Sequence, residues 1–262
     1  MSTYKQQYLI VASDMDITYH MTPNAIMLYF QDCFARFLTS KHIAAFDIIK
    51  DNLIWIIYEM QVDFLKERPL WSSQMTVKIS ITEISAIKIY VDFSLCDSHD
   101  DVFAKGTSVW AIINQNTKRP FPAVDLLSQA GITAEENHHV SNIIENAADK
   151  QHLKDVEHMV NVTDLDFNGH VCNRTYLSIS TATQPVEFIR KYSPQHLHIK
   201  FVREAFIGET LTVKVSNNGD TKYWYDIVNE KGKNICNIYS EWEDREEELS
   251  KDVSEMIDRT NI

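Results

Sequence analysis

The stretch D-L-D-F-N-G-H at residues 164–170 has an earlier counterpart, D-M-D-I-T-Y-H at residues 14–20. In both, a histidine follows the second aspartate by four residues, and the copies are 150 residues apart at either end (164 minus 14, 170 minus 20). A second pair of matching stretches is V-D-F-L-K-E at residues 62–67 and I-K-F-V-R-E at residues 199–204, which agree in residue type throughout. Two matches in the same order indicate an internal repeat. The sequence therefore predicts two copies of one helix-plus-sheet unit.

Each copy of the polar stretch precedes a helical pattern. Thr22-Pro23-Asn24 is typical of a helix start, and apolar residues then recur at helical spacing as far as Leu38. A second helix is expected from Asn173 to an interruption at Pro185. Strands are expected at Tyr8–Ala12, Leu53–Leu65, Met75–Thr82, Ile87–Leu95, Val102–Asn114, His158–Val162, His196–Val202, Thr210–Ser216, Tyr223–Asn229 and Asn234–Trp242. This order favours an α+β fold in which antiparallel sheets curl around a helix.

The repeat also divides the chain. We expect an N-terminal domain at 1–130, a helical or irregular linker at 131–155, and a C-terminal domain at 156–242. The residues from 243 to 262 are highly charged and are predicted to form a solvated helix or a frayed end.

Composition excludes several classes of function. Of the 262 residues, 44% are hydrophobic and 24% charged, as in a soluble globular protein. The net charge of −12 argues against binding to nucleic acid or to an anionic membrane, because both need a basic surface. No signal peptide or membrane span is recognised. The cysteines lie far from one another, which favours reduced thiols and a cytoplasmic protein; they are Cys33, Cys96, Cys172 and Cys236.

The segment T-D-L-D-F-N-G-H-V-C-N-R-T-Y at residues 163–176 holds the densest group of polar residues. It fits the first positions of a calcium-binding loop, but Thr175 stands where the bidentate glutamate belongs. A second interpretation is a polar turn that only caps a helix. Against this, Asp166, Asn168 and His170 alternate in front of a helix, whose N-terminus favours developing negative charge.

A third interpretation is a resemblance to the acyl-acyl carrier protein (acyl-ACP) thioesterases. Their motif, roughly D-x-D-x-N-x-H-V-N-N-x-x-Y, is similar to residues 164–176, with Cys172 in place of an asparagine. F-V-R-E at residues 201–204 resembles the family's strand that ends in a catalytic glutamate. S-V-W-A-I-I-N at residues 108–114 and T-K-R-P at residues 117–120 resemble its tryptophan strand and basic turn. The resemblance covers most of residues 4–242 and implies two tandem hotdog domains, each an antiparallel sheet wrapped around a long helix.

The resemblance also implies an activity, hydrolysis of acyl-ACP to free fatty acid and carrier protein in fatty acid biosynthesis. The implied catalytic residues are Asp166, Asn168, His170 and Glu204. Ala205 follows this glutamate where many plant members have cysteine, which excludes a cysteine nucleophile there. No cofactor or metal is implied. In the first half Thr18 replaces the asparagine, so we expect that half to supply the acyl pocket; its candidate lining residues are Phe30, Phe34 and Phe37, for which plain core packing is an equal alternative.

Two rival functions stay open from the sequence. One is a hotdog enzyme acting on coenzyme A thioesters, or a dehydratase of the same fold; the other is a non-catalytic acyl-binding protein. The expected partner is an acyl carrier protein with its acyl chain, and a homodimer is also considered. Because a carrier protein is acidic and this chain carries −12, docking would need a local basic patch. The candidates are Lys118 with Arg119, and Arg190 with Lys191.

Overall fold

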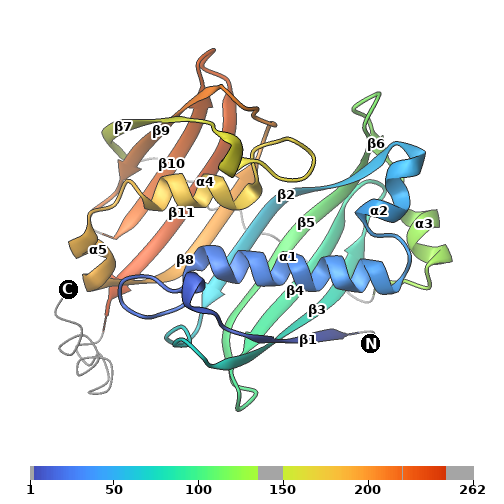
Figure 1. Cartoon of the computed structure of the whole chain (residues 1–262), viewed down its shortest axis with the longest axis horizontal. Helices are drawn as coiled ribbons and strands as arrows, with labels where there is room; N and C mark the ends of the chain where they lie inside the picture. Colours follow the sequence, from blue (N-terminus) through green and yellow to red (C-terminus); the bar gives the residue numbers. More distant parts are fainter. Residues whose placement is uncertain (1–2, 135–149, 220, 246–262) are drawn as a thin grey trace.

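A computed structural model of the chain describes residues 3–134, 150–219 and 221–245. In the first half the elements are β1 (Tyr4–Leu9), α1 (Pro23–Ser40), α2 (Ala45–Ile48), β2 (Leu53–Phe64), β3 (Gln74–Ile84), β4 (Ile89–Cys96), β5 (Val102–Asn114), β6 (Pro120–Phe121) and α3 (Val124–Gln129). In the second half they are β7 (Gln151–Met159), α4 (Asn173–Thr181), α5 (Val186–Lys191), β8 (Tyr192–Phe201), β9 (Thr210–Asn217), β10 (Lys222–Asn229) and β11 (Asn234–Asp244). The fold is α+β, with the helices α1 and α4 lying on one face of a large sheet (Figure 1).

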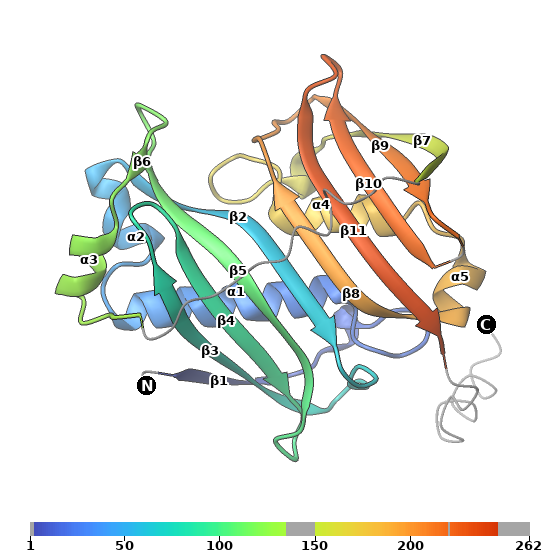
Figure 2. The ribbon, with the colours of Figure 1, turned by 180° about the vertical axis from the view of Figure 1, so that it is seen from behind.

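The strands form a single antiparallel sheet in the order β1-β3-β4-β5-β2-β8-β11-β10-β9-β7, and the short β6 pairs with β5 outside this order. The order within the first half, read from β1 to β2, recurs in the second half when read from β7 to β8. Strands β2 and β8 join the halves, and Gln61 pairs with His198. These two residues precede the matching stretches 62–67 and 199–204 and are therefore equivalent, so the sheet has an approximate internal twofold axis between them. Figure 2 shows the continuous sheet from its other face.

Helix α1 forms the centre of the first half. Its N-cap Thr22 accepts a hydrogen bond from the Ala25 backbone N–H at 3.1 Å, and Pro23 occupies the first helical position, where no N–H is needed. The buried face carries eight residues, among them Phe30, Phe34 and Phe37, which pack against the sheet. Burying such side chains stabilises the fold by about 1.5–3 kcal/mol each.

The second half differs from the expectation of a long helix in each domain. Helix α1 has 18 residues, whereas α4 has nine and is followed by the six-residue α5. Pro185 lies between the two helices and prevents continuation of the same helix, because it lacks an N–H and clashes with the preceding turn.

The edge strands also differ from the sequence prediction. Strand β1 begins at Tyr4 and ends at Leu9, so it overlaps the expected Tyr8–Ala12 only at its last two residues, and β7 begins at Gln151, within the range expected to be a linker. Both strands lie at an edge of the sheet, where polar residues are tolerated on either face. Residues 135–149 of the expected linker and 246–262 of the expected tail lie outside the described part of the chain.

The first aspartate of each polar stretch has a structural role. Asp14 and Asp164 are buried, and the carboxylate of each accepts a backbone N–H from the residue three positions earlier, at 3.2 Å and 2.9 Å. Their carbonyl oxygens accept the N–H of Thr22 and Cys172, the N-cap residues of α1 and α4. The two aspartates thus fix the same turn in front of each helix.

Candidate active site

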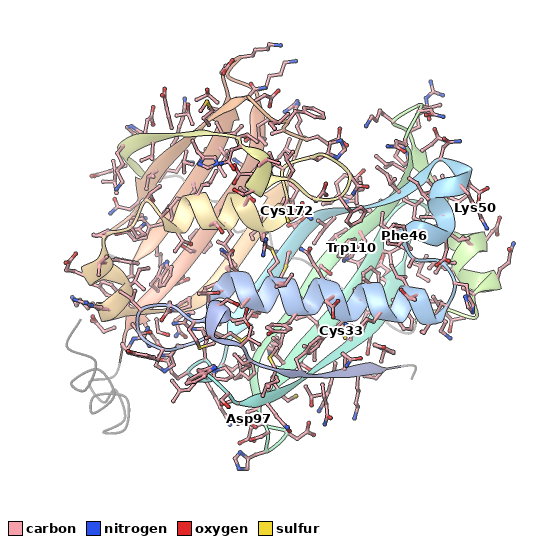
Figure 3. The ribbon with its side chains drawn as sticks, in the orientation of Figure 1. Cys33, Phe46, Lys50, Asp97, Trp110 and Cys172 are labelled. Atoms are coloured by element: carbon pink, nitrogen blue, oxygen red, sulfur yellow. The ribbon has the colours of Figure 1, made fainter. Side chains whose placement is uncertain are left out.

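A pocket of about 490 Å³ lies where the polar stretch of the second half meets β2 and β5 of the first half. All four residues that the sequence selected as catalytic line it: Asp166, Asn168, His170 and Glu204. Trp55 and Trp110 from the first half form part of the opposite wall. In Figure 3, Trp110 and Cys172, which marks the start of α4, lie near this junction. The site is therefore composite, with walls from both halves.

Asp166 organises the loop that carries Asn168 and His170. Its Oδ1 accepts the backbone N–H of Asn168 at 2.8 Å and of His170 at 3.2 Å, while its Oδ2 lies 3.4 Å from the Asn168 amide nitrogen. Gly169 has a φ of 78°, in the left-handed region that glycine adopts at little cost. This turn brings the His170 ring back toward the pocket.

Glu204 follows the end of β8. The segment before it is fixed by the N–H groups of Val202 and Arg203, which both donate to the Ile235 carbonyl. After it, the Ala205 carbonyl accepts the N–H of Val171 at 2.9 Å, which ties the glutamate segment to the polar loop. These backbone bonds explain why residues 34 positions apart in the sequence, His170 and Glu204, face each other.

The Glu204 carboxylate has two charged or titratable neighbours. The Nδ1 atom of His170 lies 3.7 Å from its Oε1, and the Nζ of Lys118 lies 3.4 Å and 3.3 Å from its two oxygens. The side chain of Glu204 is 33% exposed, so water can reach it. The His170 ring packs edge-on against Phe206, with centroids 5.2 Å apart.

The predicted acyl-lining phenylalanines do not line this pocket. Phe30 stacks on Phe93 inside the core, and Phe37 packs against Tyr4. Phe34 lies directly behind the pocket wall, with its ring centroid 5.7 Å from that of Trp55 and 4.9 Å from that of Trp110.

Two exposed aromatic residues extend the contact between the halves. Phe46 in α2 is 83% exposed and Phe167, between Asp166 and Asn168, is 75% exposed, yet their rings stack with centroids 5.9 Å apart. Sequence reasoning missed this pair. A phenylalanine within the polar motif was the available signal, but its partner lies in the other half.

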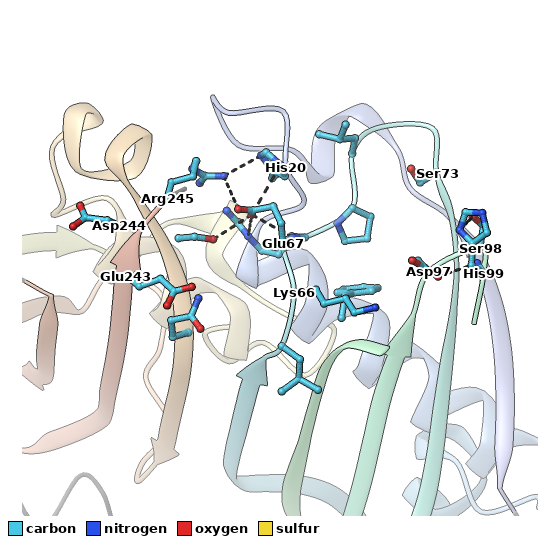
Figure 4. A pocket seen from close by; sticks show the side chains of 17 residues that line it. His20, Lys66, Glu67, Ser73, Asp97, Ser98, His99, Glu243, Asp244 and Arg245 are labelled. Atoms are coloured by element: carbon cyan, nitrogen blue, oxygen red, sulfur yellow. Dashed lines mark hydrogen bonds and ion pairs between the residues drawn. The ribbon is translucent and has the colours of Figure 1, made fainter. Parts of the chain in front are cut away.

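The equivalent place in the first half is a pocket of about 760 Å³ that includes His20, Glu67 and Arg245 (Figure 4). The His20 Nε2 lies 3.9 Å from Glu67 Oε1, similar to the spacing of His170 and Glu204. Asp16 likewise accepts the backbone N–H of the residue two positions on, Thr18, at 2.8 Å. The first half therefore retains the geometry of the second.

An additional residue changes the chemistry of this first-half cluster. In the second half the N–H of Val171 donates to the carbonyl of Ala205, the residue directly after Glu204. In the first half the equivalent N–H of Met21 donates to the carbonyl of Pro69, which lies two residues after Glu67. The extra residue is Arg68, which is buried and donates from Nη1 to Asp16 Oδ2 at 3.1 Å and to the Met21 carbonyl at 2.7 Å. Arg245 lies 3.3 Å from Glu67 and 3.1 Å from His20. Both carboxylates are thus occupied by arginine.

The arginines also affect protonation in this cluster. Burial lowers the pKa of His20; Glu67 opposes the shift, whereas Arg245 and Arg68 reinforce it. Burial alone would raise the pKa of Asp16, but Arg68 and Thr18 hold it below its usual range. His20 is therefore neutral and Asp16 ionised near pH 7.

Cysteine chemistry is disfavoured at the buried thiols. Burial raises the pKa of Cys33 to about 12 and that of Cys236 well above its usual range. Neither can supply a thiolate near neutral pH. Cys172 is half-buried at the N-cap of α4 and does not line the pocket with Glu204.

Two general searches of the described residues gave negative results. Within residues 3–134, 150–219 and 221–245, no group of three or more His, Cys, Asp or Glu side chains is placed to hold a metal ion. Over the same ranges, no helix has both the length and the apolar character needed to cross a membrane.

Comparison with family models finds two adjacent matches. Residues 1–128 match the acyl-ACP thioesterase N-terminal domain, and residues 147–244 match the acyl-ACP thioesterase C-terminal domain. A chloroplastic acyl-acyl-carrier-protein hydrolase, FATB1 of Cuphea viscosissima, is 24% identical over 74% of this chain and 49% of its own length. The chloroplastic oleoyl-acyl carrier protein thioesterase 1 of Arabidopsis thaliana is 25% identical over 66% of this chain and 51% of its own. The chain thus spans about half the length of the curated relatives it matches.

Solved structures share the whole architecture. A putative oleoyl thioesterase from Lactobacillus plantarum superposes with a TM-score of 0.83 at 18% identity, covering 94% of this chain and 98% of the other. The 12:0-ACP thioesterase from Umbellularia californica gives a TM-score of 0.75 at 16% identity, covering 93% and 98%. At these identities the likeness establishes the fold.

Proposed function

The chain belongs to the acyl-ACP thioesterase family, and from that premise we propose that it hydrolyses acyl-ACP to a free fatty acid and carrier protein. The observation that carries this proposal is the pocket, which gathers Asp166, Asn168, His170 and Glu204 between the two halves. The activity serves fatty acid biosynthesis, and the partner is an acyl carrier protein with its acyl chain.

The proposed domain organisation follows the repeat. The two halves are tandem hotdog domains at 1–130 and 156–242, joined by residues 131–155 and followed by 243–262. The matching strand orders on either side of the β2–β8 junction support this division. The helix of the second domain is the short α4, so the two copies differ most in their central helix.

In the proposed reaction Glu204 is the general base. Its carboxylate takes a proton from water as the water oxygen bonds to the thioester carbonyl carbon, and the carbonyl π electrons move onto oxygen. Collapse of this tetrahedral intermediate breaks the carbon–sulfur bond, and the protonated glutamate returns the proton to the leaving thiolate. Glu204 suits this role because its carboxylate faces the pocket and is reached by solvent.

Asp166 has a different role in this proposal. Its Oδ1 already accepts two backbone N–H groups, so the carboxylate is engaged in holding the loop. It positions Asn168 and His170, whose amide and imidazole groups orient the water and stabilise the oxyanion. The division between the carboxylates therefore rests on their hydrogen-bond partners.

The acyl chain is proposed to lie toward the first half. Trp55 and Trp110 form the apolar side of the pocket, and Phe34 supports both from behind. Phe30 and Phe37 would then affect chain length only through packing of α1, since each contacts other core residues.

The experiment that tests the function compares donors. Purified protein is given the same acyl chain on carrier protein and on coenzyme A, and release of free thiol is measured. A higher kcat/KM with the carrier-protein substrate is expected. Preference for the coenzyme A thioester would contradict the proposed donor, and binding of acyl chains without hydrolysis of either substrate would identify a non-catalytic acyl-binding protein.

A further inference from the structure

Lys118 contacts the proposed general base from the other half of the molecule. It belongs to the turn between β5 and β6, and its Nζ lies 3.3 Å and 3.4 Å from the two carboxylate oxygens of Glu204. It also lines the pocket that contains Asp166 and His170. A nearly symmetrical contact with both oxygens limits rotation of the carboxylate about its last side-chain bond.

Hydrogen bonds to Asn114 fix the backbone of the turn that carries Lys118. The Asn114 side chain accepts the N–H groups of Asn116 at 3.1 Å and Thr117 at 2.9 Å, and the Lys118 N–H donates to the Asn114 carbonyl at 2.8 Å. Lys118 itself has a φ of 56°, in the left-handed region where glycine is favoured in such turns.

The glutamate of the first half has an equivalent contact, with the roles of the two halves exchanged. Arg245 follows β11 of the second half and reaches Glu67 of the first half at 3.3 Å, just as Lys118 follows β5 and reaches Glu204. Each glutamate thus receives one cation from a chain segment that follows a strand of the opposite half. Both aspartates accept backbone N–H groups of their own loops, and the two clusters differ because Asp16 is additionally bound by Arg68.

We propose that Lys118 is a positioning residue for the hydrolysis, which holds the Glu204 carboxylate in the orientation that faces His170 and the attacking water. The proposal rests on the proposed function. It also replaces the role that the sequence suggested for Lys118, a free charge for docking of the carrier protein. On this view, residues 156–242 lack a complete site without the first half.

The test uses the whole chain and two substrates, an acyl carrier protein thioester and a small acyl thioester of coenzyme A. Lys118→Met keeps the length of the side chain and removes its charge. Lys118→Arg restores a cation. The matched control is Lys222→Met, because Lys222 forms a similar half-exposed pair with Glu241 at 2.9 Å and lies outside the pocket.

A positioning role predicts that Lys118→Met lowers kcat by about tenfold or more on both substrates, with KM within about twofold. Lys118→Arg should recover most of kcat, and Lys222→Met should match the wild type. Thermal melting should change little for Lys118→Met, because its pair with Glu204 is exposed.

Three results would overturn the role. One is a raised KM for the carrier-protein substrate alone with unchanged kcat, which is the behaviour of a docking charge. Another is a Lys118→Arg variant as slow as Lys118→Met. The third is an unimpaired Lys118→Met beside an active wild type. A wild type that hydrolyses neither substrate overturns the proposed function, and this role with it.

Discussion

Exchange of the equivalent glutamates, Glu204→Gln in one variant and Glu67→Gln in another, should separate catalysis from stability. Both residues follow the same strand pattern and lie near a histidine, at 3.7 Å and 3.9 Å. Glutamine keeps the shape and can still accept a hydrogen bond, but it carries no charge and cannot take a proton from water.

For Glu204→Gln the expected loss is kinetic. Removal of a general base lowers the rate by about 10²- to 10⁴-fold. Stability should change by less than about 1 kcal/mol, because the partners Glu204 and Lys118 are 33% and 53% exposed and such pairs contribute little.

For Glu67→Gln the expected loss is in stability. Its partner Arg245 is 7% exposed. In the variant, the neutral amide oxygen of the glutamine replaces the carboxylate beside this buried guanidinium. A fully buried pair broken in this way costs about 3–5 kcal/mol, and the 40% exposure of Glu67 reduces this to about 1–2 kcal/mol. For a protein of this size that corresponds to a decrease in Tm of roughly 3–6 °C.

The assay measures kcat/KM on an acyl-ACP substrate and Tm for each variant in the same buffer. The two variants should show opposite profiles: Glu204→Gln inactive and stable, Glu67→Gln active and less stable. If both variants lose activity equally while Tm stays constant, the protein has two working sites, and Arg68 and Arg245 do not prevent catalysis in the first half.

Three further variants test other parts of the structure. Cys172→Ser should keep hydrolysis within about tenfold, and a loss of about a thousandfold in folded protein would indicate thiol catalysis. Gly106→Ala should destabilise by about 3 kcal/mol in urea unfolding, because the new Cβ would lie 1.9 Å from the Gln61 carbonyl oxygen; wild-type stability would refute this packing. Burial lowers the pKa of His20 and His198, so the unfolded chain takes up protons near pH 6.5 before the folded one, and stability should fall as pH drops from 7.5 to 5.5. Replacing both histidines with glutamine should reduce this loss of stability at low pH. An unchanged dependence of stability on pH would show that His20 and His198 do not cause it.

Much of the candidate site follows from local patterns in the sequence. The alternation of Asp166, Asn168 and His170 is confined to five residues, and a single turn with Gly169 in the left-handed region brings them into one pocket. Glu204 could be selected only because its segment resembles the family's strand that ends in a catalytic glutamate and also repeats the pattern of residues 62–67. The central strands were likewise predictable, since their alternation reflects burial of one face.

Other features depend on contacts between distant segments. The edge strand β7 is exposed along nearly its whole length and its few apolar residues give no burial pattern, so its start at Gln151 was missed. Phe34 has the pattern of a lining residue, but whether a helical phenylalanine faces a pocket or packs behind its wall depends on the facing residues, here Trp55 and Trp110. Lys118 could not be paired with Glu204 because the two lie in different halves.

The internal twofold axis explains why one polypeptide can carry two equivalent places and, under the proposed mechanism, use one of them for chemistry. Pairing of β2 with β8 brings the polar loop of each half against the sheet of the other, so both places are built in the same way. In two identical subunits any arginine that filled one site would fill both, whereas in a single chain Arg68 affects the first half alone. The first-half cluster can then become a contact between the halves, formed by Arg245 and Glu67, while Glu204, paired with Lys118, still lines the pocket as the proposed general base. On this argument, the proposed restriction of catalysis to the pocket of Glu204 is a consequence of joining two copies in one chain, because only then can their sequences diverge.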